Sequence, residues 1–168
     1  TRFGKLREPV LWYTNVLRGL GCSRNLVWSG GGNVSPPMQP PFSPPSVFSF
    51  YLPTDRAPGS NLLAPEQKLL TTNEFTWRLG GLKWALMTVP DNATAGCDTA
   101  ALGRAFNESP RALIDQLNAR WFRGAMPPTL RSNLEALATG QGAWATPDEG
   151  ALTLMFYALS SPYFGVIK

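Results

Sequence analysis

The stretch that decides the fold is SPRALIDQLNARWF, residues 109–122. Its first two residues favour a helix start, because a serine side chain can cap backbone N–H groups and a proline at the first helical position loses no hydrogen bond. Leu113, Leu117 and Trp121 follow at four-residue spacing and therefore share one side of a helix. This stretch is predicted to be a helix that buries one face in an apolar core.

Further helices are predicted on both sides of this stretch. Each has apolar residues at helical spacing, with proline or a capping residue at its start or glycine or proline after its end. They cover residues 6–20, with the regular part beginning near Glu8, residues 65–87, residues 127–140 and residues 146–160, and residues 99–106 could add a short one. The predicted fold class is all-α, an irregular bundle of about five helices.

The helix predicted from Pro65 to Met87 is the least regular of these. The residues expected on its buried side are Leu69, Leu70, Asn73, Trp77, Gly80, Gly81 and Trp84. Each interior glycine costs about 1 kcal/mol relative to alanine. Gly80 and Gly81 therefore predict a kink or a close contact with another helix.

A long Pro/Gly-rich structured loop is predicted at residues 21–63. Three consecutive glycines at 30–32 and eight prolines exclude a regular helix there and favour extended segments and tight turns. The run VFSFYL at 47–52 is strongly apolar. We expect this run to pack back onto the helices and hold the loop in place.

The organisation along the chain is thus a helix in residues 1–20, the loop at 21–63 and a helical region at 64–168. These parts make a single helical domain, or the C-terminal part of a larger helical domain. The 43% hydrophobic content is enough to fill a core. The chain begins without Met and without an apolar signal core, so we expect any targeting segment to lie upstream.

Charge and hydropathy argue against two classes of partner. The chain has 15 Lys and Arg against 11 acidic residues, a formal charge of +4, but the basic residues are scattered singly. Nucleic-acid binding usually requires them to cluster on one face or helix, so no nucleic-acid partner is predicted. Every apolar stretch is interrupted before the roughly 20 residues that a membrane-spanning helix needs, so no membrane span is predicted.

The histidine and cysteine content limits the chemistry. The chain has no histidine, which excludes self-contained Ser-His-Asp and Cys-His systems and zinc sites that use histidine. No metal site and no cofactor is predicted. Cys22 and Cys97 lie in predicted loops, and in an exported protein they favour a disulfide worth about 4 kcal/mol in the chain-entropy model. A pair of free thiols is the alternative.

Carboxylates are the remaining candidates for catalysis. Paired acids can hydrolyse glycosides, and Glu8 with Glu66 or Asp55 is the combination worth considering. We give more weight to a structural role, in which Arg7, Glu8 and Glu66 tie helix ends to the long loop through charge-assisted hydrogen bonds.

Five aromatic residues could form a stacking platform for a sugar or another polymer: Phe48, Phe50, Tyr51, Trp77 and Trp84. Their helical and local spacing favours the core instead, because aromatic side chains bury large apolar areas. We therefore expect them to be mainly core residues, with the exposed platform as the alternative.

Several short segments are similar to a known family. They are GKLREPVL at 4–11, PF at 41–42, PSVFSF at 45–50, APEQ at 64–67 and LSSPYF at 159–164. In order and rough spacing they resemble the C-terminal part of the domain of unknown function 1800 family, over about two thirds of the chain. This resemblance implies a large, mostly helical, often exported bacterial protein, whose acidic and histidine-containing motifs lie upstream of the part present here.

From the residues and the resemblance together, we expect a non-catalytic structural or interaction region of an exported bacterial protein, periplasmic or extracellular. Its expected partner is the upstream part of the same protein, with another exported protein or a polysaccharide as further candidates. One alternative is the C-terminal part of a hydrolytic or metal-dependent enzyme whose chemical groups lie upstream. A second alternative is glycan or polymer binding through exposed aromatics.

Overall fold

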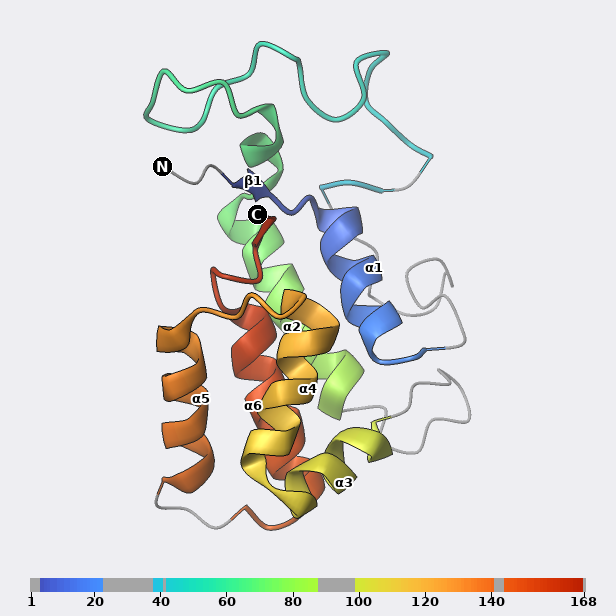
Figure 1. The fold of residues 1–168 in the computed structure, drawn as a ribbon. Coiled ribbons are helices and arrows are strands. Elements are labelled where there is room, and N and C mark those ends of the chain that lie inside the picture. The colour runs from blue at the N-terminus through green and yellow to red at the C-terminus, as the bar shows by residue number, and fades with distance from the viewer. Residues whose placement is uncertain (1–3, 23–37, 41, 88–98, 141–143, 168) are drawn as a thin grey trace.

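The computed structural model describes residues 4–22, 38–40, 42–87, 99–140 and 144–167 (Figure 1). These residues are mostly helical, which confirms the all-α fold class. The helices are α1 (Pro9–Gly19), a 3-10 helix η1 (Pro65–Leu69), α2 (Thr72–Met87), α3 (Ala100–Glu108), α4 (Pro110–Phe122), α5 (Pro128–Thr139) and α6 (Pro147–Ser160), and the strands are β1 (Lys5–Leu6) and β2 (Val166–Ile167). The helix considered optional at residues 99–106 is present as α3.

The helices begin where their capping residues predict. The Ser109 hydroxyl accepts a hydrogen bond from the Ala112 N–H at 3.0 Å, and the Thr146 hydroxyl accepts one from the Glu149 N–H at 3.2 Å. The Glu149 carboxylate accepts in return from the Ala145 N–H at 3.0 Å. Reciprocal bonds of this kind satisfy the free N–H groups of a first helical turn. These two helix starts are therefore correct to the residue.

The core lies around α6, which contacts α2, α3, α4 and α5. Leu154 and Met155 of α6 and Leu113 and Leu117 of α4 are fully buried. The C-terminal tail adds Phe164, which is fully buried with its ring 5.9 Å from that of Trp12. Burying a side chain of this size contributes about 1.5–3 kcal/mol.

The two ends of the chain form an antiparallel strand pair that sequence reasoning did not predict. Lys5 lies opposite Ile167 and Leu6 opposite Val166. The Arg7 N–H extends the pairing by donating to the Gly165 carbonyl at 2.8 Å. Of the helix predicted at 6–20, Leu6 lies in strand β1 instead. Regular helix starts at Pro9, as expected for a first-turn proline.

The continuous helix predicted from Pro65 to Met87 is wrong. A 3-10 helix ends at Leu69, and α2 starts at Thr72 after Thr71 has accepted a hydrogen bond from the Glu74 N–H at 3.1 Å. Its buried side is also different. Glu74, Arg78, Leu82 and Leu86 are buried, whereas Leu70, Asn73, Trp77 and Gly80 are exposed. Helix α2 continues through Gly80 to the buried Gly81, and the side chain of Trp84 lies outside the described part of the structure.

The loop packs onto the helices only in part as predicted, because Phe50 and Tyr51 of the run 47–52 are half-buried and the Tyr51 hydroxyl donates to Glu8, which precedes α1. Of the run 47–52, Val47 is 95% exposed, Phe48 57% and Leu52 43%. An isolated bridge between Ser46 and Ser49 closes a local turn at the start of this run, and Val47 and Phe48 within that turn are exposed. The longest described part of the loop, residues 42–63, lies at one end of the molecule, and α3 lies at the other (Figure 1).

The cysteine prediction lies partly outside the described residues. Cys22 follows α1 and packs against the core. Cys97 is outside the described part of the chain. The Cys22–Cys97 disulfide therefore stays a prediction.

Candidate functional site

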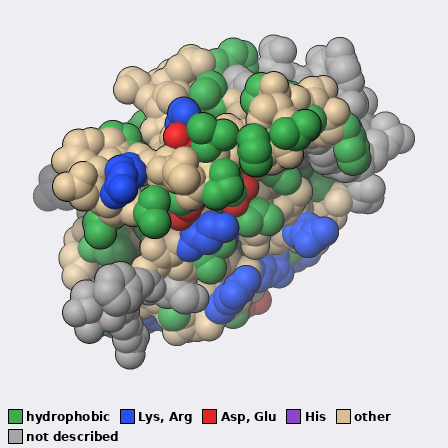
Figure 2. Space-filling view, turned by 90° about the horizontal axis from the view of Figure 1, so that it is seen from above, with side chains coloured by type: hydrophobic (Ala, Val, Ile, Leu, Met, Phe, Trp, Pro, Cys, Tyr) green, Lys and Arg blue, Asp and Glu red, His purple; other side chains and the backbone are tan. Residues whose placement is uncertain are grey.

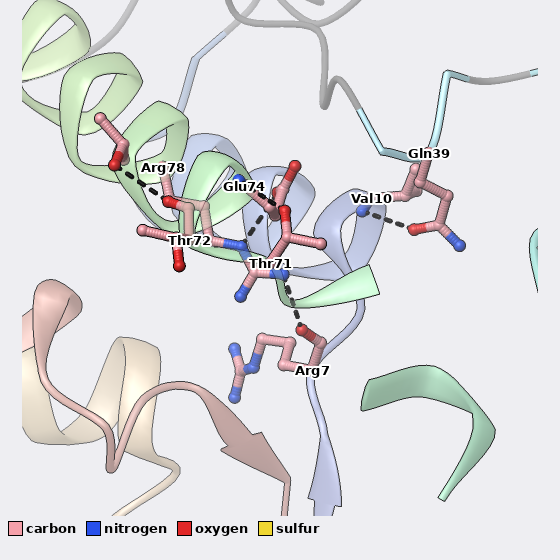
Figure 3. Close-up of polar contacts among 8 residues, drawn as sticks. Arg7, Val10, Gln39, Thr71, Thr72, Glu74 and Arg78 are labelled. Carbon is pink, nitrogen blue, oxygen red and sulfur yellow. Dashed lines mark hydrogen bonds and ion pairs between the residues drawn. The ribbon is translucent and has the colours of Figure 1, made fainter. Parts of the chain in front are cut away.

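Two charged side chains of α2 are buried beside the start of α1. The Arg78 Nε and the Glu74 Oε1 are 3.1 Å apart, with side-chain exposures of 4% and 0%. Figure 3 shows Arg78 reaching past Glu74 to Arg7, whose backbone carbonyl accepts a hydrogen bond from the Arg78 Nη2 at 3.3 Å. The guanidinium also lies 5.7 Å from the centre of the Trp12 ring. These contacts connect helix α2 to Arg7, which directly follows β1, and to Trp12 of α1.

The electrostatics of this pair are those of a buried carboxylate. Desolvation raises the pKa of Glu74, and the hydrogen bond and charge of Arg78 act in the opposite direction without cancelling it. One carboxylate oxygen, Oε2, has no hydrogen-bond partner in the described ranges. Perturbed carboxylates of this kind occur at functional sites and in structural ion pairs alike. The i, i+4 spacing of Glu74 and Arg78 was the signal that could have revealed the pair.

A second polar cluster lies where α1 begins. The Glu8 carboxylate accepts hydrogen bonds from Gln39 Nε2 at 2.8 Å and Tyr51 OH at 2.9 Å, and Lys5 Nζ lies 3.3 Å away. Gln39 also accepts from the Val10 N–H at 3.0 Å, as Figure 3 shows. Because that N–H belongs to the first turn, the loop supplies a cap that the helix lacks. Glu8 and Gln39 thus tie the loop to α1.

The titration of this cluster follows from its hydrogen bonds. Burial alone would raise the pKa of Glu8, but the hydrogen bonds from Gln39, Tyr51 and Lys5 outweigh burial and lower it. Burial and the hydrogen bond to Glu8 raise the pKa of Tyr51 to about 12. Glu8 is therefore a fixed acceptor, ionised well below neutral pH.

The carboxylates considered for catalysis are only partly brought together. Glu66 is near enough for its charge to raise the pKa of Tyr51, so it shares a neighbour with Glu8. Asp55 instead forms an ion pair with Lys68 at 3.1 Å and accepts from the Leu52 N–H at 2.7 Å, and this backbone bond is the main reason for its lowered pKa. Glu66 has no ion pair among the described residues. Each carboxylate with a partner serves to hold the loop.

Arg7 lies differently from the ion-pair role expected of it. The residue is 7% exposed, and its Nε and Nη1 have no hydrogen-bond partner within the described part of the chain. In Figure 3 the guanidinium points away from Glu74. It stacks instead on Phe164, 4.1 Å from the ring centre.

The aromatic residues are less buried than expected. Phe48 and Trp77 are exposed, and Phe50 and Tyr51 are half-buried. The expectation that this set belongs to the core is therefore wrong for Phe48 and Trp77. The aromatic residues of the described core are instead Trp12, Tyr13, Trp121, Phe122 and Phe164.

Exposed apolar side chains gather on the loop and are called here the apolar loop surface. Its residues are Phe42, Val47, Phe48, Leu52, Leu62 and Leu63. Figure 2, which views the molecule from the loop end, shows hydrophobic side chains across this face with basic side chains among them. Next to β2 lies an apolar groove of about 400 Å³ between Leu6, Leu70, Phe75, Leu79 and Pro162, with Arg78 in its wall.

Comparison with known proteins gives no relative. No protein-family model, no curated protein and no solved structure matches the chain. No helix in the described ranges is long and apolar enough to cross a membrane. The function is therefore inferred from the surfaces and clusters above.

Proposed function

We propose that this chain is a non-catalytic, interaction-bearing region of an exported bacterial protein, and that its apolar loop surface packs against the upstream part of the same protein. The observation that carries the proposal is the exposure of large apolar side chains on one loop, with Phe42 and Val47 both 95% exposed. Large apolar side chains that are exposed together on one face are typical of protein–protein contacts. Burying each such side chain would contribute about 1.5–3 kcal/mol.

The loop is held in place without its partner, which supports a docking role. Glu8 fixes it through Gln39 and Tyr51, and Asp55 fixes it through Lys68. A loop that is ordered before binding loses less conformational entropy when the partner arrives. The exposed side chains are thus displayed on a prepared surface.

The engagement of the acidic residues supports a non-catalytic role. Glu8, Asp55 and Glu74 each accept hydrogen bonds from side chains that hold the fold. A general acid or base needs a proton that it can exchange with a substrate. The resemblance to the C-terminal part of larger proteins is the reason for choosing the upstream part as the occupant.

The test is binding between this chain and the separately produced upstream part. The double variant Val47→Ser/Phe48→Ser removes two members of the apolar loop surface. We expect it to weaken binding by at least about tenfold, which corresponds to about 1.4 kcal/mol. Tyr157→Ser on α6 is the matched control, since Tyr157 is 54% exposed and Phe48 57%. It should change the affinity by less than about twofold.

Two outcomes would count against the proposal. Absence of a complex, or equal affinity of the double variant and the wild type in calorimetry, would contradict it. If the assembled protein hydrolyses a substrate and loses that activity in Glu8→Gln at unchanged stability, the enzyme alternative is favoured. If a polysaccharide changes the tryptophan fluorescence and Trp77→Phe abolishes the change, the glycan alternative is favoured.

A further inference from the structure

A small cleft lies between the end of β1, the C-terminus of α4 and the C-terminal tail. Its volume is about 100 Å³, and Arg7, Arg123, Tyr163 and Ile167 are among its lining residues. This cleft lies apart from the apolar loop surface, and only Val166 is shared with the apolar groove.

The Arg7 guanidinium is a buried cation without an anionic partner among the residues that the structure describes. With 7% exposure, it has two nitrogens that no acceptor reaches. Its contact with Phe164 compensates part of the lost hydration, because the ring face is negative. Burial, with the charges of Arg123 and Arg78, lowers the pKa of Arg7 to about 10, so the group stays charged at neutral pH. Buried charges in proteins are normally paired, and no acidic side chain in the described ranges pairs with this one.

A second cation is held beside it in an unusual backbone conformation. Arg123 ends α4 with φ 55° and ψ 34°, a left-handed conformation that glycine or asparagine adopts at lower cost. Arg123 has no ion pair among the described residues, and its charge is one cause of the lowered pKa of Arg7. Two arginines of like charge therefore line one cleft. The indole N–H edge of Trp121, which has no hydrogen-bond partner among the described residues, lies against Gly19.

We propose that the cleft between Arg7 and Arg123 binds an oxyanion of carboxylate or phosphate size. Guanidinium groups offer N–H donors in a planar arrangement that matches two oxygens of such a group. The volume admits a group of a few atoms and excludes a whole sugar or nucleotide. The oxyanion comes either from a free small anion or from an acidic side chain of the partner. The second source rests on the proposed function, and the first does not.

The first arm of the test uses the complete chain alone with inorganic phosphate and with acetate. Calorimetry at constant ionic strength, balanced with sodium chloride, separates binding from screening. Arg123→Asn removes the cation while keeping a residue that tolerates the left-handed conformation, so this variant is expected to fold. Arg7→Gln removes the buried cation, and its folding is checked by circular dichroism. Arg104→Gln on α3, at the opposite end of the molecule, is the control (Figure 1).

We expect Arg123→Asn and Arg7→Gln each to weaken anion binding by about tenfold or more and Arg104→Gln to leave it unchanged, since charge-assisted bonds are the strong ones. This result establishes the oxyanion site, and a free anion is its ligand if Arg123→Asn leaves the second arm unchanged. In the second arm, the upstream part is titrated onto the same variants. If neither small anion binds but Arg123→Asn weakens this complex and Arg104→Gln does not, the ligand is a carboxylate of the partner.

Two results would overturn the inference. One is equal anion binding by all variants, and the other is no dependence on Arg123 in either arm. Failure of the proposed function can be told apart from failure of this inference. The Val47→Ser/Phe48→Ser variant tests the apolar loop surface and leaves both arginines of the cleft unchanged. If the upstream part does not bind at all, the phosphate and acetate arm alone decides.

Discussion

At the scale of single residues, the Glu74–Arg78 pair places two charges inside an apolar bundle. Each keeps the other from being an uncompensated buried charge, so removing one should cost more than removing both. We expect Glu74→Gln and Arg78→Met each to lower the free energy of unfolding by about 3–5 kcal/mol. The double variant Glu74→Leu/Arg78→Met should lose much less, because apolar replacement of a whole buried pair is often near neutral. Urea unfolding measures all three, and additive losses would contradict a coupled pair.

Glu8 gives a prediction for acid stability. Its folded-state pKa lies below the ordinary value of 4.5, because hydrogen bonds favour the ionised form. A depressed pKa contributes stability that is present above pH 4.5 and is lost as the pH falls through the folded pKa. The wild type should therefore lose stability more steeply below that pH than Glu8→Gln, in urea unfolding at a series of pH values. Glu66→Gln, which removes a neighbouring carboxylate, is the control, and parallel curves for the wild type and Glu8→Gln would contradict the prediction.

At the scale of helices, two glycines should respond in opposite ways to alanine. A Cβ at Gly80 of α2 meets nothing within 4 Å, whereas one at Gly19 would overlap the indole of Trp121. Gly80→Ala should stabilise by about 0.5–1 kcal/mol through helix propensity. Gly19→Ala should destabilise by about 1–3 kcal/mol through overpacking between α1 and α4. Thermal unfolding of the two variants decides, and equal shifts would show that α1 and α4 do not approach closely at Gly19.

The helices also show which features of the fold could be predicted from the sequence. The starts of α4 and α6 were predictable because Ser109 and Thr146 act on N–H groups three residues away, within the same segment. The buried side of α2 was not predictable from the sequence. The glycines and aromatics indicated the side with Trp77, whereas the ion pair of Glu74 and Arg78 lies on the side that is buried. The exposure of Phe48 depends on a turn closed between Ser46 and Ser49, and hydrophobicity alone does not reveal such a turn.

At the scale of the whole molecule, the pairing of the two chain ends could not be predicted either. Strands of two residues carry no periodic pattern, and their partners lie at opposite ends of the sequence. The same pairing creates the clefts on both sides of the tail, since Val166 lines each of them. The cleft and the apolar groove therefore both lie beside the β1–β2 pair. The cleft between Arg7 and Arg123 could not be predicted without knowing that the two ends pair. Only the three-dimensional structure revealed it.

Phe164 is the residue that contributes most to holding the C-terminal tail against the N-terminal segment. Its ring is fully buried, lies 5.9 Å from the rings of both Trp12 and Phe122, and supports the Arg7 guanidinium. Phe164→Ala removes apolar burial, leaves a cavity and takes away the cation–π contact. We expect a loss of about 3–5 kcal/mol in the free energy of unfolding, measured by urea denaturation. Phe164→Leu keeps most of the volume and should lose less. Tyr163→Ala, at the neighbouring exposed side chain, should cost less than about 1 kcal/mol, and a comparable loss there would mean that the tail as a whole, and not the Phe164 ring, holds the two ends together.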